Sequence, residues 1–237
     1  MIWHADVVNG PAAGRGTAVK ICGLMQPRHA LAAAESGADM LGMVFASSRR
    51  QVSPGTARGI VAALRGRADR PLLVGVFVNE STERMLEIAE QVGLDLLQLS
   101  GDESAEQVDE CAAYYPTIKA VRFPATMPTE QAIAELGPYT RLERGERVRL
   151  LLDTYSPGVY GGTGETADWS LAAAIAERLP LILAGGLNPD NVGAAIEQVS
   201  PWAVDVSSGV ETGGVKDSSL IREFISAASY APAAPKG

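Results

Sequence analysis

The sequence predicts an α/β protein folded as a single (β/α)8 barrel, the TIM-barrel architecture. Eight short apolar runs recur along the 237 residues, and helix signals fill the spacers between them. The length is close to the roughly 250 residues typical of this barrel. A doubly wound open sheet is the alternative. It rarely has eight regular units and usually carries an early G-x-G-x-x-G, which this sequence lacks.

The predicted strands are short apolar runs of the kind that form parallel strands buried on both faces. They cover residues 19–22, 40–45, 72–78, 94–99, 118–123, 148–153, 181–184 and 203–207. We expect the barrel to occupy residues 19–228. Residues 1–18, rich in Gly and Ala, are predicted to be a flexible extension, and the tail 229–237, which includes APAAPKG, is predicted to be disordered.

Proline and glycine mark the helices in the spacers. Pro27 and Pro54 are each predicted to open a helix, because proline is favoured in the first turn. Gly37 and Gly93 follow predicted helix ends, where glycine adopts a left-handed conformation without strain. Asp217 is placed to cap the last helix. Strands and helices are thus expected to alternate along the whole barrel.

Composition and charge narrow the classes of function. Hydrophobic residues make up 46% and charged residues 20%, which suits a globular protein with a full core. The net charge of −8 argues against nucleic acid or an anionic membrane as a partner. Loop N–H groups can still bind a phosphate locally. A small phosphorylated ligand is therefore compatible with the negative net charge. We expect the chain to be a monomer or a weak homodimer.

The numbers of cysteines and histidines bear on the cellular compartment and on metal binding. Two cysteines, Cys22 and Cys111, fit a reduced cytoplasmic protein better than a disulfide scaffold. The only histidines are His4 and His29, so no metal site is expected. Neither a secretory signal nor a run of about 18 apolar residues is found, so no membrane span is expected. Cys111 is expected to be structural and His29 to be exposed.

Chemistry in such a barrel takes place at the carboxyl ends of the strands. Asp153 directly follows Leu150-Leu151-Leu152, at the tip of the sixth predicted strand. Apolar surroundings favour the neutral form of a carboxyl group, which a general acid must carry. A structural salt bridge is the alternative for this residue.

Cys22 stands at the tip of the first predicted strand, directly before Gly23. A thiolate there can act as a general base if a nearby positive charge lowers its pKa. The alternative is a small buried apolar side chain, which is the commoner place of an isolated cysteine. Position at the strand tip favours the catalytic interpretation.

The loops after the last three strands are rich in Gly and Ser. Backbone N–H groups in such loops can surround a phosphate, at the place where barrels of this kind often bind one. Turn chemistry alone explains any one of these loops, but three consecutive loops favour a phosphate site. The predicted phosphate-binding residues are Gly162, Gly164, Gly185, Gly186, Ser207, Ser208 and Gly209.

Arg50 and Gln98 are the predicted contacts to the rest of the ligand. Arg50 closely follows the second strand at the same rim, where its guanidinium can hold a carboxylate as a bidentate pair. Gln98 lies near the end of the fourth strand, as Asn79 and Asp205 lie near the ends of the third and eighth. For these three, hydrogen bonding that supports the barrel interior is an equal alternative.

These residues lie in motifs that resemble the phosphoribosylanthranilate isomerase family. The matching segments extend from Val19 to about Phe224 and include KICG at 20–23, VGVFVN at 74–79, AGGLNPDN at 184–191, VDVSSGVE at 204–211 and GVKD at 214–217. The resemblance implies a (β/α)8 isomerase of tryptophan biosynthesis. Its reaction is an Amadori rearrangement of N-(5'-phosphoribosyl)anthranilate to 1-(2-carboxyphenylamino)-1-deoxyribulose 5-phosphate.

Residue by residue, the resemblance implies that Cys22 is the catalytic base, that Asp153 is the catalytic acid and that Arg50 holds the anthranilate carboxylate. The substrate's own imine is the electron sink in this reaction, so no cofactor is implied. Two departures stand out. Ser100 occupies a position where the family usually has a histidine, and the loop after Phe45 is one residue shorter than usual.

Other enzymes on the same barrel fit the strand tips less well. The ketol-isomerase of the histidine pathway uses aspartates at strands one and five, where this chain has Cys22, Lys119 and Arg122. A metal-dependent epimerase needs histidine ligands that the chain lacks. A non-catalytic or altered-specificity barrel that binds phosphosugars stays open as the alternative, with Ser100 as its only support.

Overall fold

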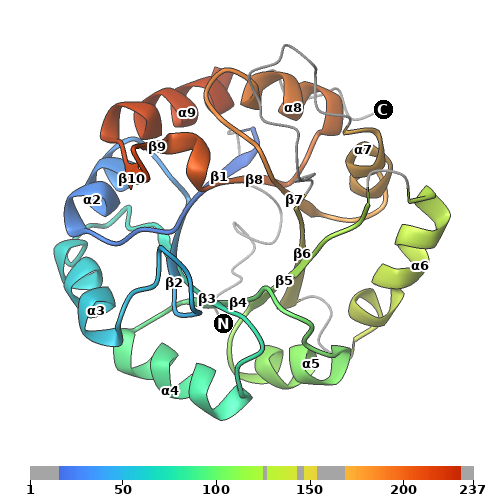
Figure 1. Ribbon diagram of the computed structural model, residues 1–237, viewed down its shortest axis with the longest axis horizontal. Coiled ribbons are helices and arrows are strands. Elements are labelled where there is room, and N and C mark those ends of the chain that lie inside the picture. Colours follow the sequence, from blue (N-terminus) through green and yellow to red (C-terminus); the bar gives the residue numbers. More distant parts are fainter. Residues whose placement is uncertain (1–15, 125–126, 143–146, 154–168, 231–237) are drawn as a thin grey trace.

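The computed structural model describes residues 16–124, 127–142, 147–153 and 169–230. Eight parallel strands follow one another around a closed barrel, and β8 pairs with β1 (Figure 1). The predicted fold class is therefore confirmed. The strands are β1 (Ala18–Cys22), β2 (Met40–Val44), β3 (Leu72–Phe77), β4 (Leu96–Leu99), β5 (Thr117–Val121), β6 (Val148–Asp153), β7 (Leu181–Ala184) and β8 (Ala203–Val206).

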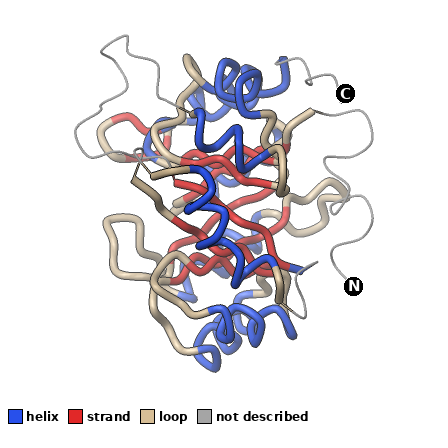
Figure 2. Tube along the Cα trace, turned by 90° about the vertical axis from the view of Figure 1, so that its right-hand side faces the viewer, coloured by secondary structure: helices blue, strands red, loops and turns tan. Residues whose placement is uncertain are grey.

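Helices form the outer layer of the barrel and cover the strands on all sides (Figures 1 and 2). Each one follows a strand in sequence, as expected of right-handed βαβ units. They are α2 (Pro27–Glu35), α3 (Pro54–Ala63), α4 (Thr82–Val92), α5 (Ala105–Tyr114), α6 (Thr129–Thr140), α7 (Ser170–Ala176), α8 (Val192–Val199) and α9 (Ser218–Tyr230).

Short polar side chains begin several of these helices. Ser53, Ser81 and Ser104 each accept a hydrogen bond from the backbone N–H three residues later, at 3.1, 3.3 and 3.3 Å. Asp217 caps α9 as predicted, because its Oδ1 accepts the N–H two residues later at 2.8 Å. Gly93 ends α4 with a φ of +79°, a conformation that glycine adopts without strain.

The start of β4 differs from the predicted range 94–99. The strand begins at Leu96, and the Leu94 N–H instead donates to Ala89 O in the last turn of α4 at 2.9 Å. The Asp95 carboxylate accepts the Leu73 N–H at 2.8 Å and forms an ion pair with Arg70 at 2.6 Å.

The two ends of the described chain reach past the predicted barrel limits. β1 begins at Ala18, within the predicted extension 1–18, because Ala18 pairs in register with Ala203 of β8. α9 continues to Tyr230, within the predicted tail 229–237. Its length follows from a buried apolar face that includes Phe224 and Ala228.

The barrel interior is filled by side chains that alternate along each strand. Every strand contributes at least one apolar residue to a buried cluster inside the barrel, and successive strand residues point to opposite faces. This cluster consists of Ala18, Met40, Val74, Leu96, Ile118, Leu151, Ile182, Ala184 and Ala203. Along each strand, the side chains two or four positions closer to the carboxyl end also point inward. The cluster therefore forms the floor of whatever site lies at the carboxyl ends.

No helix in the described parts of the chain is long and apolar enough to cross a membrane.

Candidate active site

A cavity of about 340 Å³ opens at the carboxyl ends of the strands. This volume is within the range of small-molecule sites. Every strand, or the loop that follows it, contributes to the wall. The lining residues are Cys22, Val44, Ser48, Arg50, Val76, Val78, Gln98, Ser100, Ala120, Arg122, Leu151, Asp153, Ala184, Gly185, Gly186, Leu187, Asp205, Val206, Ser207 and Ser208.

Most of the residues predicted from sequence meet at this cavity, although they come from distant parts of the chain. Two further predicted residues, Gly162 and Gly164, lie outside the described residues. Gly209 is adjacent to the wall but not part of it. The predicted residues that line the cavity are Cys22, Arg50, Gln98, Asp153, Gly185, Gly186, Ser207 and Ser208.

Cys22 lies above a buried ion pair. Lys20 precedes it by two residues, so both side chains point to the barrel interior. Lys20 is fully buried, and its Nζ lies 2.9 Å from Asp205 Oδ1 on the neighbouring strand. Burial disfavours the ammonium form, but the Asp205 carboxylate raises the pKa of Lys20 above its ordinary value. Lys20 is therefore a fixed positive charge beneath the thiol.

The pKa of the Cys22 thiol is raised above its ordinary value, which differs from the lowered pKa required by the sequence-based prediction. Burial is the main cause, because it disfavours the thiolate. Lys20 and Lys216 act in the opposite direction, while Asp205 adds to the effect of burial. Positive charges do lie beside the thiol, as the prediction required, but burial outweighs them in the absence of a ligand.

Asp153 lies at the cavity wall and also forms a salt bridge. It is the last residue of β6, and its Oδ2 accepts a hydrogen bond from Arg122 Nε at 3.0 Å. The Arg122 side chain is 70% exposed, so this pair sits at the open mouth of the cavity. Asp153 therefore lines the cavity and also forms the salt bridge that was its alternative interpretation, while its role as the general acid stays a prediction.

Gln98 presents a buried carbonyl oxygen to the cavity. Its Nε2 donates to Ser100 Oγ at 3.1 Å, which fixes the orientation of the amide. Its Oε1 is buried and has no hydrogen-bond partner among the described residues. A buried acceptor without a partner is costly, so a ligand N–H or O–H is the expected partner.

A short loop after β2 carries Arg50 to the cavity. Val52 N–H donates to Val44 O at 2.8 Å and Gln51 Nε2 to Phe45 O at 3.1 Å, so the loop folds back on the strand that precedes it. The stem of Arg50 then lies over Gly23, where any β-carbon would collide with Arg50 Cδ. Gly23 also has a φ of +79°. This glycine is needed both for its conformation and for the close approach of the arginine.

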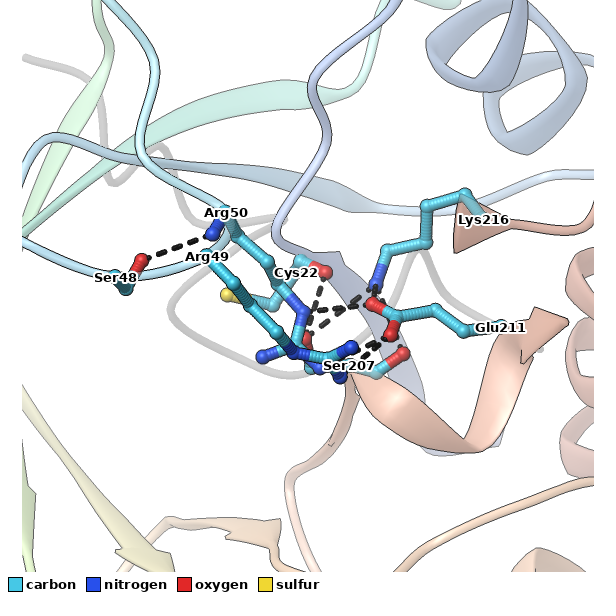
Figure 3. A network of polar contacts seen from close by, with 7 residues as sticks. All are labelled: Cys22, Ser48, Arg49, Arg50, Ser207, Glu211 and Lys216. Atoms are coloured by element: carbon cyan, nitrogen blue, oxygen red, sulfur yellow. Dashed lines mark hydrogen bonds and ion pairs between the residues drawn. The ribbon is translucent and has the colours of Figure 1, made fainter. Parts of the chain in front are cut away.

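A small hairpin after β8 brings a second set of charges to the same rim. It consists of β9 (Glu211–Thr212) and β10 (Val215–Lys216), joined by two glycines that both have positive φ. Register places Glu211 directly opposite Lys216, and their side chains pair at 2.6 Å. Lys216 also donates to the carbonyl oxygen of Ser207 at 2.8 Å, as drawn in Figure 3.

The loops after β7 and β8 lie against each other. Gly185 and Gly186 have φ values of +95° and +65°, so this turn requires glycine. Gly209 is needed for a different reason, because a β-carbon there would collide with the backbone carbonyl of Leu187. The close contact of the two loops places their backbones side by side at the cavity wall.

The site residues predicted from sequence do not include Lys20, Glu211 or Lys216. For Lys20, the available signal is a charged residue inside an apolar strand, two positions before Cys22. For the other two, the signal is Gly213-Gly214, a pair typical of two-residue hairpins, which places the flanking Glu and Lys across from each other.

His29 is buried rather than exposed, because α2 turns this face toward the barrel. Among the described residues, no three His, Cys, Asp or Glu side chains gather as metal ligands would.

Comparison with known proteins finds relatives over nearly the whole barrel. The sequence profile of the N-(5'phosphoribosyl)anthranilate (PRA) isomerase family matches residues 19–227. The N-(5'-phosphoribosyl)anthranilate isomerase of Roseiflexus sp. (strain RS-1) is 48% identical over 217 residues, which cover 90% of this chain and 98% of the relative.

Solved structures show the same similarity. The crystal structure of phosphoribosyl anthranilate isomerase from Thermotoga maritima matches with a TM-score of 0.77 and 42% identity, covering 90% of this chain and 98% of that one. A phosphoribosyl anthranilate isomerase in complex with reduced 1-(o-carboxyphenylamino)-1-deoxyribulose 5-phosphate matches with a TM-score of 0.74 and 39% identity over the same shares of the two chains.

Proposed function

The chain belongs to the N-(5'-phosphoribosyl)anthranilate isomerase family, and we propose that Cys22 and Asp153 are the base and acid with which it catalyses this isomerisation. The reaction is a step of tryptophan biosynthesis. It converts the aminoaldose N-(5'-phosphoribosyl)anthranilate into the aminoketose 1-(2-carboxyphenylamino)-1-deoxyribulose 5-phosphate. One observation carries the proposal: the thiol and the carboxyl group line the same cavity of about 340 Å³.

The two ends of this substrate are anionic, and the cavity has a suitable wall for each. Gly185, Gly186, Ser207 and Ser208 form one wall, and their backbones suit the phosphate. Arg50 borders the cavity as well and suits the anthranilate carboxylate. Gln98 Oε1, the buried acceptor, suits a donor of the substrate between these ends. Interactions at both ends orient the reacting carbons.

The proposed chemistry is an exchange of protons that needs one acid and one base. Asp153 protonates the ribose ring oxygen, and the C1–O bond breaks to give a protonated imine. Cys22, as thiolate, removes the proton from C2, and the electron pair moves toward the imine nitrogen. The resulting enolamine takes a proton at C1 from the Cys22 thiol and gives the proton of its C2 hydroxyl to the Asp153 carboxylate, which yields the ketone and restores both groups. Atoms and charge balance without any other reactant.

The raised pKa of Cys22 agrees with this order of steps. A thiol of high pKa gives a strong base once it is deprotonated. The ring-opened iminium adds a positive charge close to the thiol, next to those of Lys20 and Lys216, and so favours the thiolate when the base is needed. The thiolate is therefore expected to form in the substrate complex rather than in the empty cavity.

Two substitutions test the assignment. Cys22→Ala and Asp153→Asn should each lower kcat by about 10²-fold or more, since each removes one proton-transfer group. Cys111→Ala is the matched control, because Cys111 is a buried helical cysteine whose pKa burial raises to about 11 and which does not line the cavity. Turnover of N-(5'-phosphoribosyl)anthranilate by the purified variants measures the effect.

Complementation of a tryptophan auxotroph that lacks this isomerase gives a second measure. The unchanged chain and Cys111→Ala should restore growth, and Cys22→Ala should not. Near-normal turnover in Cys22→Ala or Asp153→Asn would remove that residue from the mechanism. Failure of the unchanged chain in both assays would favour a phosphosugar-binding barrel without this activity.

A further inference from the structure

Glu211 holds three cationic side chains on a single buried carboxylate (Figure 3). Its side chain is only 4% exposed. Oε1 accepts hydrogen bonds from Arg50 Nε and from Lys216 Nζ, both at 2.6 Å. Oε2 accepts from Arg49 Nη2 at 2.8 Å and from Arg50 Nη2 at 3.1 Å. Each oxygen therefore has two donors, so the carboxylate has little freedom to rotate.

Glu211 stays ionised because of these neighbours. Burial alone would favour its neutral form, but Arg50 and Lys216 hold the pKa of Glu211 below its ordinary value. One negative charge faces three positive ones, so the cluster keeps a net charge of about +2. The cluster can therefore attract an anion even though Glu211 is already bound within it.

Glu211 is hydrogen-bonded to only one of the two edges with which the Arg50 guanidinium can bind a carboxylate. Glu211 takes the side-on edge, formed by Nε and Nη2. The end-on edge includes Nη1, to which no other described residue is hydrogen-bonded. A guanidinium can bind one carboxylate at each of these edges. Arg50 borders the cavity, and the end-on edge is the part of its guanidinium that Glu211 leaves for a ligand.

We propose that Glu211 is a positioning residue that orients Arg50 so that the end-on edge of its guanidinium meets the carboxylate of the substrate. The inference rests on the substrate-binding role proposed above for Arg50. Two contacts fix the arginine from opposite sides: Glu211 holds the head, and the close approach to Gly23 confines the stem. Orientation before binding reduces the entropy that the substrate complex has to lose.

A double-mutant cycle in the full-length chain tests this inference. Glu211→Gln should raise KM for N-(5'-phosphoribosyl)anthranilate by about tenfold or more, as loss of a charge-assisted hydrogen bond does. Its kcat should change much less, because the acid and the base are untouched. Arg50→Ala should raise KM similarly. Adding Glu211→Gln to Arg50→Ala should have no further effect beyond about twofold.

Two single-ended probes distinguish orientation of Arg50 from a general collapse of the rim. Inhibition by anthranilate, which carries only the carboxylate end, should weaken in Glu211→Gln. Inhibition by inorganic phosphate should not weaken, because Lys216 still donates to Ser207 and the rim loses a negative charge. Glu130→Gln is the matched control, since it breaks a glutamate–arginine pair on the exposed outer layer and should leave KM unchanged. If Glu211→Gln does not fold, Glu211→Asp takes its place in the cycle.

The outcomes separate this inference from the proposed function. If Arg50→Ala binds substrate normally, the role of Arg50 is wrong and the role of Glu211 falls with it. If Arg50→Ala is impaired but Glu211→Gln is not, only the positioning role is wrong. A loss from Glu211→Gln that persists in the Arg50→Ala background, or equal weakening of both inhibitors, also overturns the positioning role alone.

Discussion

Lys20 carries a positive charge into the barrel interior, where no solvent reaches it. Its 2.9 Å ion pair with Asp205 makes this possible, because a buried ammonium group without a partner costs several kcal/mol. Cys22 lies within the field of this pair, and the effect of Lys20 on its pKa exceeds that of Asp205. The pKa of the Cys22 thiol is thus lowered by a residue that is fully buried beneath it.

Removal of this ion pair should change the pH dependence of the enzyme. In Lys20→Met/Asp205→Asn, burial continues to raise the pKa of Cys22 and the opposing effect of Lys20 is gone. The acid limb of kcat/KM, along which the thiolate is lost, should therefore move to higher pH. The double variant avoids leaving an unpaired Asp205. A profile identical to that of the unchanged enzyme would show that Lys20 does not act on the base.

At the residue scale, the sequence predicted which residues line the cavity better than it predicted the burial and charge around them. Cys22, Arg50 and Asp153 were found because each stands at or just after a strand tip, a place that chain order alone reveals. Glu211 was missed because its importance depends on a hairpin that turns it back toward Arg50, 161 residues away in sequence. The raised pKa of Cys22 could not be predicted, since burial and nearby charge oppose each other and only the structure gives their balance.

The pairing of β1 with β2 determines where the thiol lies. Gly42 is the register partner of Cys22 and has no side chain to fill the space beside it. A β-carbon at position 42 would stand 2.8 Å from Cys22 Sγ, closer than packed atoms allow, and 3.2 Å from Lys20 Nζ, a tight contact. The strand pair therefore leaves room for the thiol only because this position is a glycine.

Gly42→Ala should consequently displace Cys22 and lower kcat by about tenfold or more, with a smaller effect on KM. Gly59→Ala, in the middle of α3, is the matched control, because a β-carbon there has no heavy atom within 4 Å. Steady-state kinetics of both variants, together with their circular dichroism, measure the effect. Equal kcat in the two variants would mean that the site tolerates a shifted thiol.

At the element scale, strand order, helix starts and the bounds of β6 and β7 followed from sequence, but contacts between neighbouring strands did not. Asp95, just before β4, accepts the Leu73 N–H of the neighbouring strand, a contact between segments that no local pattern reveals. Lys119 is a second example. It belongs to β5 but points away from the cavity, and pairs with buried Glu103 at 2.7 Å behind the strand. The side of β5 on which Lys119 lies is set by the register of β5 with β6. The positions of apolar runs in the sequence do not determine that register.

For the whole molecule, two buried carboxylates should make folding sensitive to acid. Burial opposes ionisation of Glu103 and Glu211, yet Lys119 and backbone N–H groups hold the pKa of Glu103 below its ordinary 4.5, as Arg50 and Lys216 do for Glu211. A carboxylate whose pKa is lower in the folded state stabilises the protein above its unfolded pKa. That stability is lost as the pH falls through the folded value.

The free energy of unfolding, measured with urea, should therefore begin to fall as the pH drops below about 4.5. Glu103→Gln should be less stable than the unchanged chain at neutral pH, by about 3 kcal/mol, because it leaves Lys119 buried without a countercharge. It should also lose less stability on acidification. Equal urea midpoints at neutral pH and at about pH 3.5 would contradict the expectation.

The fold of the whole molecule was predictable because eight apolar runs and their helix signals admit few arrangements other than a closed barrel. The site was predictable in part, because parallel strands bring their carboxyl ends to one rim. What sequence alone left open is which charged side chains pair between distant parts of the chain, since Lys20–Asp205 and Arg50–Glu211 each join residues more than 100 positions apart.

Lys20 and Asp205 face each other where the first and last strands meet, in direct register. They lie 185 residues apart in the chain, and the hairpin that holds Arg50 follows β8. The charge beneath the thiol and the orientation of the arginine therefore both depend on closure of the barrel between its first and last strands.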